Sequence, residues 1–347
     1  MELNDSHVRQ VLEKNYGGIA SGETTLFYSG LSNLWLVDSS PRKMLLKEMP
    51  NRFPIEGVRK EPVICAHLME NGIPTSQFLR TRNGDFVFQD GKRSYHLQYF
   101  IDGTVYELNE CPDLLVDEMG KSLALIHRHL GALPNVGFDD HLGPQWILGY
   151  DKKKKVDEFS RILSRLSEKQ ELQNRDEILA DVEYRIDALE RLDLEEYTET
   201  DVGRLTCHPT HGDYHCRQVI SQNQQIAGII DFTTACNLPV TWEIARAFTQ
   251  SDSSASNGEI DYGRFRSYIG NYLSVELLSV VDLKYLFACY FLQLLGSTFG
   301  YRQIAAGESI ENSFMDMTSF ASWRTKMCRW LEPNRQDLTR CLIEDFG

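Results

Sequence analysis

The spacing of apolar residues changes near Cys111, and this change limits the folds open to the chain more than any other feature. Before it, five segments rich in aromatic and large apolar residues alternate with turn sequences such as SSPR, RNGD and DGKR. The segments are TTLFYSG, NLWLVDS, KMLLKEM, DFVFQDG and SYHLQYFIDG. Short strands at this spacing predict an antiparallel sheet.

One helix is expected inside this strand-rich region. In the segment RKEPVICAHLMENGIP, helical spacing places four apolar residues on one face, and Gly72 then closes the element. The four residues are Ile64, Cys65, Leu68 and Met69.

After Cys111 the period is helical. Five apolar residues lie three or four positions apart between Pro112 and Gly131: Leu115, Met119, Leu123, Ile126 and Leu130. Two exposed amphipathic helices are expected over 151–170 and 175–192, and more helices follow the hairpin segment QVIS…QIAGIIDF. The pattern predicts a β-rich front, a linking strand near 97–103 and a helical back with a small hairpin embedded in it.

Composition narrows the class of protein. The chain has 347 residues, 42% of them hydrophobic, which is enough for sizeable cores. A formal net charge of −14 argues against a general nucleic-acid surface and is compatible with cationic small molecules as ligands. The eight cysteines include no C-x-x-C pair, so neither a zinc knuckle nor a disulfide framework is indicated. With no run near 18 apolar residues, we expect a cytoplasmic protein without a membrane span.

The segment THGDYHCRQVI concentrates ionisable side chains in one loop. Gly212 lets the backbone turn sharply and present Asp213 at the loop tip. Gln218 begins an apolar strand, and Asp231 ends the run IAGIID, so a hairpin would bring these two together with Asp213 facing them. An amide oxygen beside two carboxylates suits Mg²⁺. The alternative is a capped turn with solvent-facing acids.

Two further features are compatible with binding of phosphate groups. Lys47 lies inside an apolar strand, where burial is costly unless an anion such as Glu61 meets it. Alternatively, Lys47 lies at a sheet edge and Glu61 is an acid at a helix start. Upstream, Gly30, Ser32 and Asn33 form a small turn whose N–H groups could cover phosphates, or a plain β-turn.

The order of these elements is similar to the protein-kinase plan: a strand loop, a strand lysine, a helix glutamate, a linker, an HGD loop and a strand ending in ID. The forms H-G-D-x-H and I-I-D-F resemble the aminoglycoside phosphotransferase superfamily, which includes choline kinases, one type of homoserine kinase and spore-coat kinase-like proteins. The resemblance covers most of the chain. It implies an α+β, two-lobed protein-kinase-like fold. Residues 1–101 would form an N-terminal nucleotide-binding lobe with an antiparallel sheet and a hinge near 97–103. Residues 102–347 would form a mostly helical C-terminal lobe.

The resemblance also implies catalytic and metal roles. Asp213 would orient the acceptor hydroxyl and take its proton, while Asp231 would hold Mg²⁺ on the nucleotide phosphates. Gln218 stands where the family usually has asparagine as a second metal ligand. Its side chain is one methylene longer, so the resemblance leaves the second metal site in doubt.

For the nucleotide, the resemblance implies that Lys47, steadied by Glu61, contacts the α- and β-phosphates of ATP. Backbone groups of Tyr99 and Ile101 would hold the adenine, with Gln98 beside its pocket. The turn with Gly30, Ser32 and Asn33 would be the phosphate loop.

The function implied is ATP-dependent transfer of the γ-phosphate to a hydroxyl of a small molecule, such as an aminoglycoside, an amino alcohol, homoserine or a sugar. The alternative is a kinase-like assembly protein of the spore-coat type that has little or no activity. Gln218 favours this alternative. The retained set of Lys47, Glu61, Asp213 and Asp231 opposes it, because a non-catalytic protein has no physical need for all four.

Polar residues around the loop are expected to support it. His211 is predicted to shape the loop by hydrogen bonds, and His127 to occupy a buried, hydrogen-bonded helix position. Glu243 is predicted to have a core or capping role. His215 and Arg217 are expected to meet solvent or a local acid rather than an acceptor.

Overall fold

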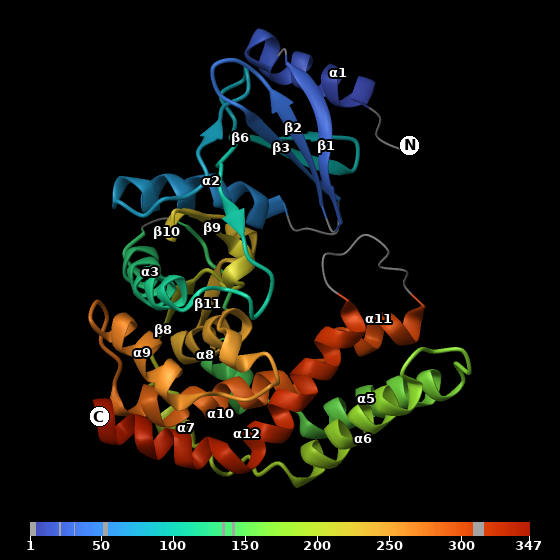
Figure 1. The fold of residues 1–347 in the computed structure, drawn as a ribbon, viewed down its shortest axis with the longest axis vertical. Helices are drawn as coiled ribbons and strands as arrows, with labels where there is room; N and C mark the ends of the chain where they lie inside the picture. The colour runs from blue at the N-terminus through green and yellow to red at the C-terminus, as the bar shows by residue number, and fades with distance from the viewer. Residues whose placement is uncertain are drawn as a thin grey trace.

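The computed structural model describes residues 5–20, 22–30, 32–50, 55–133, 136–140, 143–307 and 316–347. A smaller part with most of the strands lies at one end of the molecule, and a larger helical part lies at the other (Figure 1). The C-terminus lies among the helices of the larger part.

The smaller part is built on one antiparallel sheet, as the alternation of strands and turns predicts. Its strand order is β1-β2-β3-β6-β4, and β5 also pairs with β6. The bounds are β1 Glu23–Ser29, β2 Asn33–Asp38, β3 Met44–Pro50, β4 Phe78–Leu79, β5 Val87–Asp90 and β6 Arg93–Tyr99. Helix α1 (Asp5–Tyr16) leads through the 3₁₀ turn η1 (Gly17–Ala20) into the sheet, and its buried Val8 and Leu12 share a core with Trp35 and Leu97.

Helix α2 (Ile55–Glu70) connects the two parts. Its buried Ile64, Cys65 and Leu68 belong to the core of the larger part rather than to that of the sheet. Gly72 adopts a φ of +79° just after the helix, which confirms its predicted place at the helix end. The predicted helix is confirmed, and of the four residues on its apolar face only Met69 is exposed, at 40%. It lies on the solvent edge of the apolar stripe, because α2 is covered on one side only.

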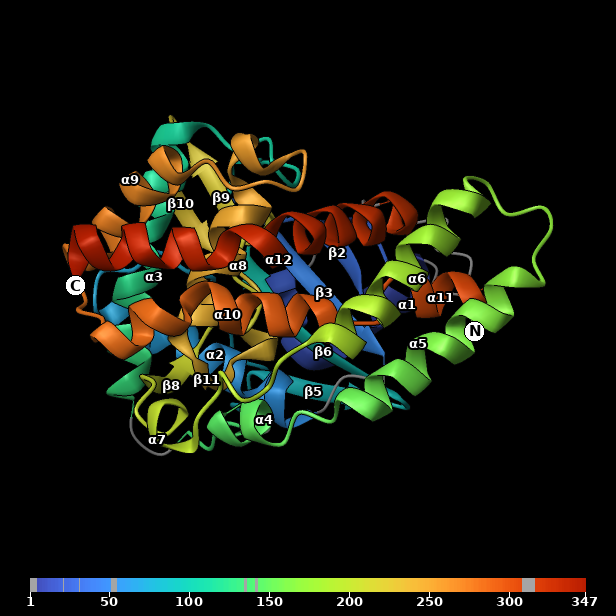
Figure 2. The same ribbon diagram turned by 90° about the horizontal axis from the view of Figure 1, so that it is seen from below.

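The larger part is mainly helical. Its helices are α3 Asp113–Gly131, α4 Pro144–Leu148, α5 Lys152–Ser167, α6 Arg175–Arg191, α7 Glu199–Val202, α8 Val240–Ser251, α9 Tyr262–Leu273, α10 Val280–Gly296, α11 Tyr301–Ala306 and α12 Met317–Phe346. The five apolar residues predicted for one face of α3 are all at most 1% exposed. Helix α12 runs alongside α10, while α5 and α6 pair at one side (Figure 2).

One stretch of the described chain, Val280–Ala306, is apolar and long enough to cross a membrane by length and composition. Asp282 and Lys284 interrupt it near its start. Its most apolar window is 67% buried, since α10 is a core helix of the larger part.

Two small sheets position the loop rich in ionisable residues. The first has the order β10-β9-β7, with β7 Thr104–Val105, β9 Val219–Gln222 and β10 Gln225–Ile229. The second pairs β8 Cys207–Thr210 with β11 Cys236–Pro239. Short 3₁₀ turns lie at Cys216–Gln218 (η2), Phe232–Thr234 (η3) and Ser253–Ala255 (η4). The predicted hairpin is therefore confirmed as β9 and β10, and the loop lies between β8 and β9.

The buried apolar residues form two clusters. One draws on α1, β2, β3 and β6, and the other collects the apolar face of α2 together with residues from Cys111 onward. Helix α2 precedes residue 101 but packs into the second cluster. The predicted boundary between an N-terminal lobe ending at residue 101 and a C-terminal lobe beginning at residue 102 therefore stays a prediction.

Candidate active site

Gly212 gives the loop after β8 its sharp turn. Its φ is +81°, in the region that favours glycine, and a Cβ atom there would lie 2.1 Å from the carbonyl oxygen of Thr234. Both the conformation and the close approach exclude a side chain. Asp213 is presented immediately after this turn, as the sequence predicts.

Glu243 of α8 holds the loop from beneath. Its carboxylate accepts hydrogen bonds from the backbone N–H groups of His211 (3.2 Å) and Gly212 (2.5 Å), and it lies 2.9 Å from His127 Nε2. Burial raises the pKa of Glu243, but the hydrogen bond and charge of His127 outweigh burial and leave the pKa below its usual value. His127 also lies 2.9 Å from the Tyr272 hydroxyl. The supporting roles predicted for His127 and Glu243 are confirmed.

His211 makes the remaining internal contacts of the loop. It is fully buried, its Nε2 lies 3.0 Å from the carbonyl oxygen of Ile230, and its Nδ1 accepts from the Asp213 N–H at 3.3 Å. The loop and the end of β10 are therefore joined through one imidazole, which confirms the predicted structural role of His211.

Asp213 is surrounded by donors. Its Oδ1 accepts from Arg246, and its Oδ2 lies 3.2 Å from Gln218 Nε2 and 3.6 Å from His215 Nε2. Burial raises the pKa of Asp213, but the charges of Arg246 and His215 outweigh burial and hold the pKa well below its usual range. The carboxylate is thus ionised. His215 meets a local acid, as expected, and so does Arg217, which lies 3.6 Å from Glu107.

Arg246 was not predicted as a site residue. Its only signal is a cation inside the apolar helix segment WEIARAF, three positions after Glu243 and therefore on the same helical face. That face meets the loop, so α8 supplies both an acid for the loop backbone and a cation for Asp213.

Lys47 forms an ion pair across the two parts of the molecule. Its Nζ lies 2.7 Å from Asp231 Oδ1 and 4.0 Å from Glu61 Oε2. Burial lowers the pKa of Lys47, but the charges of Asp231 and Glu61 outweigh burial and raise it. Lys47 is 8% exposed in β3, between β2 and β6, so the alternative of a lysine at a sheet edge is wrong.

Glu61 lies inside α2 and is buried, so it is not an acid at the helix start. It is 1% exposed, its Oε1 accepts from the Phe232 N–H at 3.2 Å, and its Oε2 lies 3.2 Å from His96 Nε2. His96 was not predicted. It is the register partner of Lys47 in β6, and the signal was a histidine within the apolar strand SYHLQY. Glu61 thereby ties α2 to β6 and to the segment after Asp231.

One of the two carboxylate oxygens of Asp231 is engaged by described side chains. Its Oδ1 meets Lys47 and the Thr233 hydroxyl (2.6 Å), whereas no described side chain forms a hydrogen bond or ion pair with Oδ2, and the side chain is 38% exposed. Burial raises the pKa of Asp231, but the charge of Lys47 outweighs burial and lowers it. The residue is ionised, and its φ of +65° is strained for a residue with a side chain.

The hairpin brings Gln218 beside Asp231, because the Ile230 N–H donates to the Gln218 carbonyl at 3.0 Å. The Gln218 side chain, however, directs its amide nitrogen to Asp213. Within the described residues, no group of three or more His, Cys, Asp or Glu could hold a metal ion. Mg²⁺ needs few protein ligands beside phosphate oxygens and water, so Asp231 Oδ2 and the Gln218 amide oxygen fit such an ion. Their role as ligands stays a prediction.

The predicted adenine contacts lie at the end of β6. Gln98 is 9% exposed, and the Tyr99 N–H already donates to the Gln77 carbonyl at 2.9 Å. The Ile101 N–H has no backbone acceptor among the described residues, and the adenine-binding role of these residues stays a prediction. The Arg42 guanidinium covers the Tyr99 ring at 3.8 Å.

The predicted phosphate loop is the turn between β1 and β2. The Gly30 N–H donates to the Ser32 carbonyl at 3.1 Å, and Asn33 accepts from Ser29 (2.8 Å) and donates to Glu48 (3.2 Å). These bonds define a closed turn, so the phosphate role of Gly30, Ser32 and Asn33 stays a prediction.

Comparison with known proteins gives a family match. The chain matches the phosphotransferase enzyme family over residues 23–278, a range that contains Lys47, Glu61, Asp213 and Asp231. A search of the curated proteins found no match.

Solved structures of similar fold are small-molecule kinases. They include amicoumacin kinase hAmiN in complex with AMP-PNP, Ca²⁺ and Ami (11% identity, 94% of each chain, TM-score 0.60). A microcompartment-associated aminopropanol kinase shares 15% identity over 98% of this chain and 100% of its own, with a TM-score of 0.62. Spectinomycin phosphotransferase APH(9)-Ia, in complex with ADP and spectinomycin, shares 13% identity over 99% of each chain, with a TM-score of 0.54. At these identities the likeness concerns the fold, and it confirms the predicted kinase-like architecture.

Proposed function

Because the chain belongs to the phosphotransferase enzyme family, we propose that it transfers the γ-phosphate of ATP to a hydroxyl group of a small molecule. The observation that carries this proposal is the pairing of Lys47 with Asp231 at 2.7 Å, from strand and hairpin residues 184 positions apart. An ionised Asp213 lies nearby on a loop held by Glu243. Phosphoryl transfer requires positioning and charge neutralisation more than covalent help from the protein.

Asp213 would orient the acceptor hydroxyl. Its Oδ1 is engaged by Arg246, and Oδ2, which already accepts from Gln218 at 3.2 Å, would accept from the hydroxyl through its second lone pair. A carboxylate with a lowered pKa is a weak base, and it would take the proton only once bond formation to phosphorus has acidified the hydroxyl. Gln218 and His215 steady the same oxygen.

Lys47 would meet nucleotide phosphate oxygens, and Asp231 Oδ2 with the Gln218 amide oxygen would hold Mg²⁺. When bound, the metal ion would neutralise charge on the phosphates. One of the similar structures contains AMP-PNP and Ca²⁺, and another contains ADP. They support the proposal that this protein binds a nucleotide together with a divalent cation.

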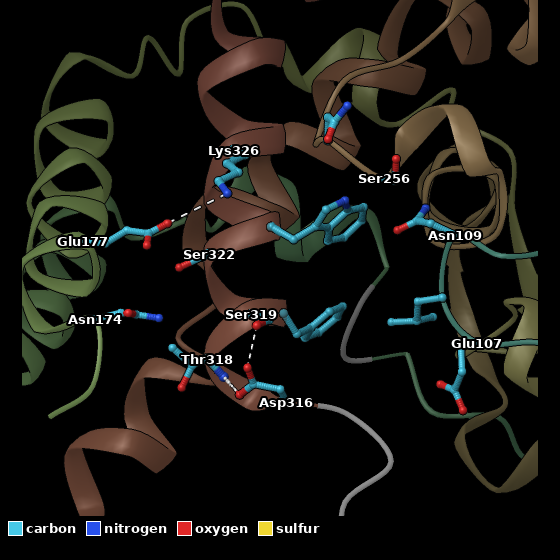
Figure 3. A pocket seen from close by; sticks show the side chains of 14 residues that line it. Glu107, Asn109, Asn174, Glu177, Ser256, Asp316, Thr318, Ser319, Ser322 and Lys326 are labelled. Atoms are coloured by element: carbon cyan, nitrogen blue, oxygen red, sulfur yellow. Dashed lines mark hydrogen bonds and ion pairs between the residues drawn. The ribbon is translucent and has the colours of Figure 1, made fainter.

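A cavity of about 720 Å³, shown in Figure 3, offers room for an acceptor. It lies between the loop at 107–109, the segment at 256–257 and the start of α12. The Cys216 thiol donates to the Glu107 carbonyl, which joins this cavity wall to the loop of Asp213. An aminoglycoside, an amino alcohol, homoserine or a sugar would fit a cavity of this size.

The test is Asp213→Asn, measured by ADP release against a panel of amines, amino alcohols and sugars. We expect turnover to fall by about 10²-fold or more, since the variant loses the charge that orients and accepts the proton. Stabilisation by ATP and Mg²⁺ in a thermal-shift titration should persist in Asp213→Asn and be lost in Lys47→Met. Near-normal turnover by Asp213→Asn would refute the mechanism.

The alternative of a non-catalytic assembly protein is separated by the same titration. A wild-type protein that gains no thermal stability from millimolar ATP and Mg²⁺ would favour assembly over catalysis.

A further inference from the structure

A buried cation on α12 has no anionic partner. Arg324 is 5% exposed, yet within the described residues it forms no ion pair and no hydrogen bond. Its guanidinium lies 5.6 Å from the centre of the Phe320 ring, and Phe320 lines the cavity proposed for the acceptor. A buried charge without a partner costs stability, so a reason for keeping it is expected.

Part of the Arg246 guanidinium is also buried without a partner. One terminal nitrogen, Nη2, binds Asp213, whereas the other, Nη1, is buried without a hydrogen-bond partner among the described residues. The guanidinium therefore has donors left over within contact distance of the carboxylate that would orient the acceptor.

Tyr290 links α10 to α8, the helix that carries Arg246. Its hydroxyl lies 2.5 Å from that of Thr249 on α8. Burial raises the pKa of Tyr290 to about 12, and the Thr249 hydrogen bond and the charges of Arg324 and Arg246 oppose this rise. Burial also lowers the pKa of Arg324 to about 10, and the charges of Arg185 and Arg246 add to the decrease. The charges that act on Tyr290 and Arg324 are thus mainly positive.

The acids that line the cavity are already engaged. Glu107 lies 3.6 Å from Arg217, Glu177 lies 3.8 Å from Lys326, and Asp316 caps α12 by accepting from Thr318 at 3.0 Å (Figure 3). They do not neutralise Arg246 or Arg324. The unmatched charge on this side of the catalytic loop is positive, although the whole chain is acidic.

We propose that Arg246 and Arg324 bind an anionic group of the acceptor, a carboxylate or a phosphate, and that its hydroxyl thereby faces Asp213. Planar guanidinium groups match both anions with paired hydrogen bonds. This proposal rests on the phosphotransfer function and specifies the class of its acceptor. It favours an anionic acceptor over the cationic ligands with which the net charge of the chain is compatible.

The substrate test uses acceptors that differ only in the charged end. They are γ-hydroxybutyrate, butanediol and aminobutanol for a carboxylate, and glycerol phosphate against glycerol for a phosphate. We expect kcat/KM for one of the anionic acceptors to exceed that of its matched neutral acceptor by about 10²-fold. A preference for the neutral or amine acceptors would overturn the proposal.

The residue test is Arg324→Met. It should reduce kcat/KM for the anionic acceptor by about 10²-fold and leave the neutral one within about threefold. Its Tm should stay equal or rise, because methionine removes an unpaired buried charge, whereas Arg324→Lys should keep part of the preference. The control is Arg329→Met on the same helix, which is 44% exposed and should leave the preference unchanged. An unchanged preference in Arg324→Met would refute the role of Arg324.

A binding measurement separates this inference from the phosphotransfer function. With ADP and Mg²⁺ saturating, inorganic phosphate should raise the Tm of the wild type but not of Arg324→Met. If this shift occurs and no acceptor is phosphorylated, the anion site stands and phosphotransfer fails. If neutral acceptors are phosphorylated and no shift occurs, phosphotransfer stands and the anion site fails.

Discussion

Glu243 offers a sharp test of how the catalytic loop is held. The variant Glu243→Ala would remove the acceptor for three donors: the N–H groups of His211 and Gly212 and the His127 ring. Each buried donor left without a partner costs about 1–3 kcal/mol. Because these donors share one carboxylate, their losses are not additive, and we expect a total of about 3–5 kcal/mol in the free energy of unfolding.

The assay is urea unfolding followed by tryptophan fluorescence and far-UV circular dichroism. Glu243→Gln keeps the shape and one acceptor oxygen, so its cost should be smaller, about 1–2 kcal/mol. The control is Glu276→Gln, since Glu276 pairs with Arg128 at 2.8 Å at the surface with 33% of its side chain exposed. It should cost about 1 kcal/mol or less. If Glu243→Ala costs no more than this control, the loop does not depend on Glu243 and the reasoning is wrong.

Two further predictions concern the carboxylates. Gln218→Ala removes one hydrogen bond to Asp213 and the amide oxygen proposed to hold Mg²⁺. Steady-state kinetics should therefore show a kcat lower by about tenfold and a higher KM for MgATP; an unchanged kcat would contradict this. Asp213, Asp231 and Glu243 have folded-state pKa values below the unfolded values of about 4, so their stabilisation is present above that pH and is lost as the pH falls. Tm should therefore drop between about pH 5 and pH 3, less steeply in Asp213→Asn, and an identical slope would count against the assignment.

Much of the architecture could be predicted from local pattern. The buried face of α3 and the hairpin β9–β10 follow from the spacing of apolar residues. That spacing is a local property, because it involves residues only a few positions apart in the sequence. The turn at Gly212 was equally readable, because only glycine fits its positive φ and close packing. The exposure of Met69 could not be predicted, because helical spacing shows which residues share a face but not how wide the covered part of that face is.

The candidate site divides in the same way. Lys47, Glu61, Asp213 and Asp231 stand out because each is a charge beside apolar or turn residues, and the resemblance to kinases gave each a role. The partners of these residues could not be foreseen. His96 meets Glu61 only because β6 pairs with β3 in that register, and Arg246 meets Asp213 only because α8 packs beneath the loop.

By itself, the sequence determined the kinds of element, their order and the glycine-dependent turn, since these depend on conformational preferences and periodicities that act over a few residues. The tertiary structure alone decided which charges are matched. Lys47 meets Asp231 across 184 positions, while Arg324 is buried on α12 with no described anion beside it. Composition counts charges over the whole chain, but the cost of a charge depends on its burial and on what lies within a few ångströms. For that reason an acidic chain can have a binding region that lacks negative charge.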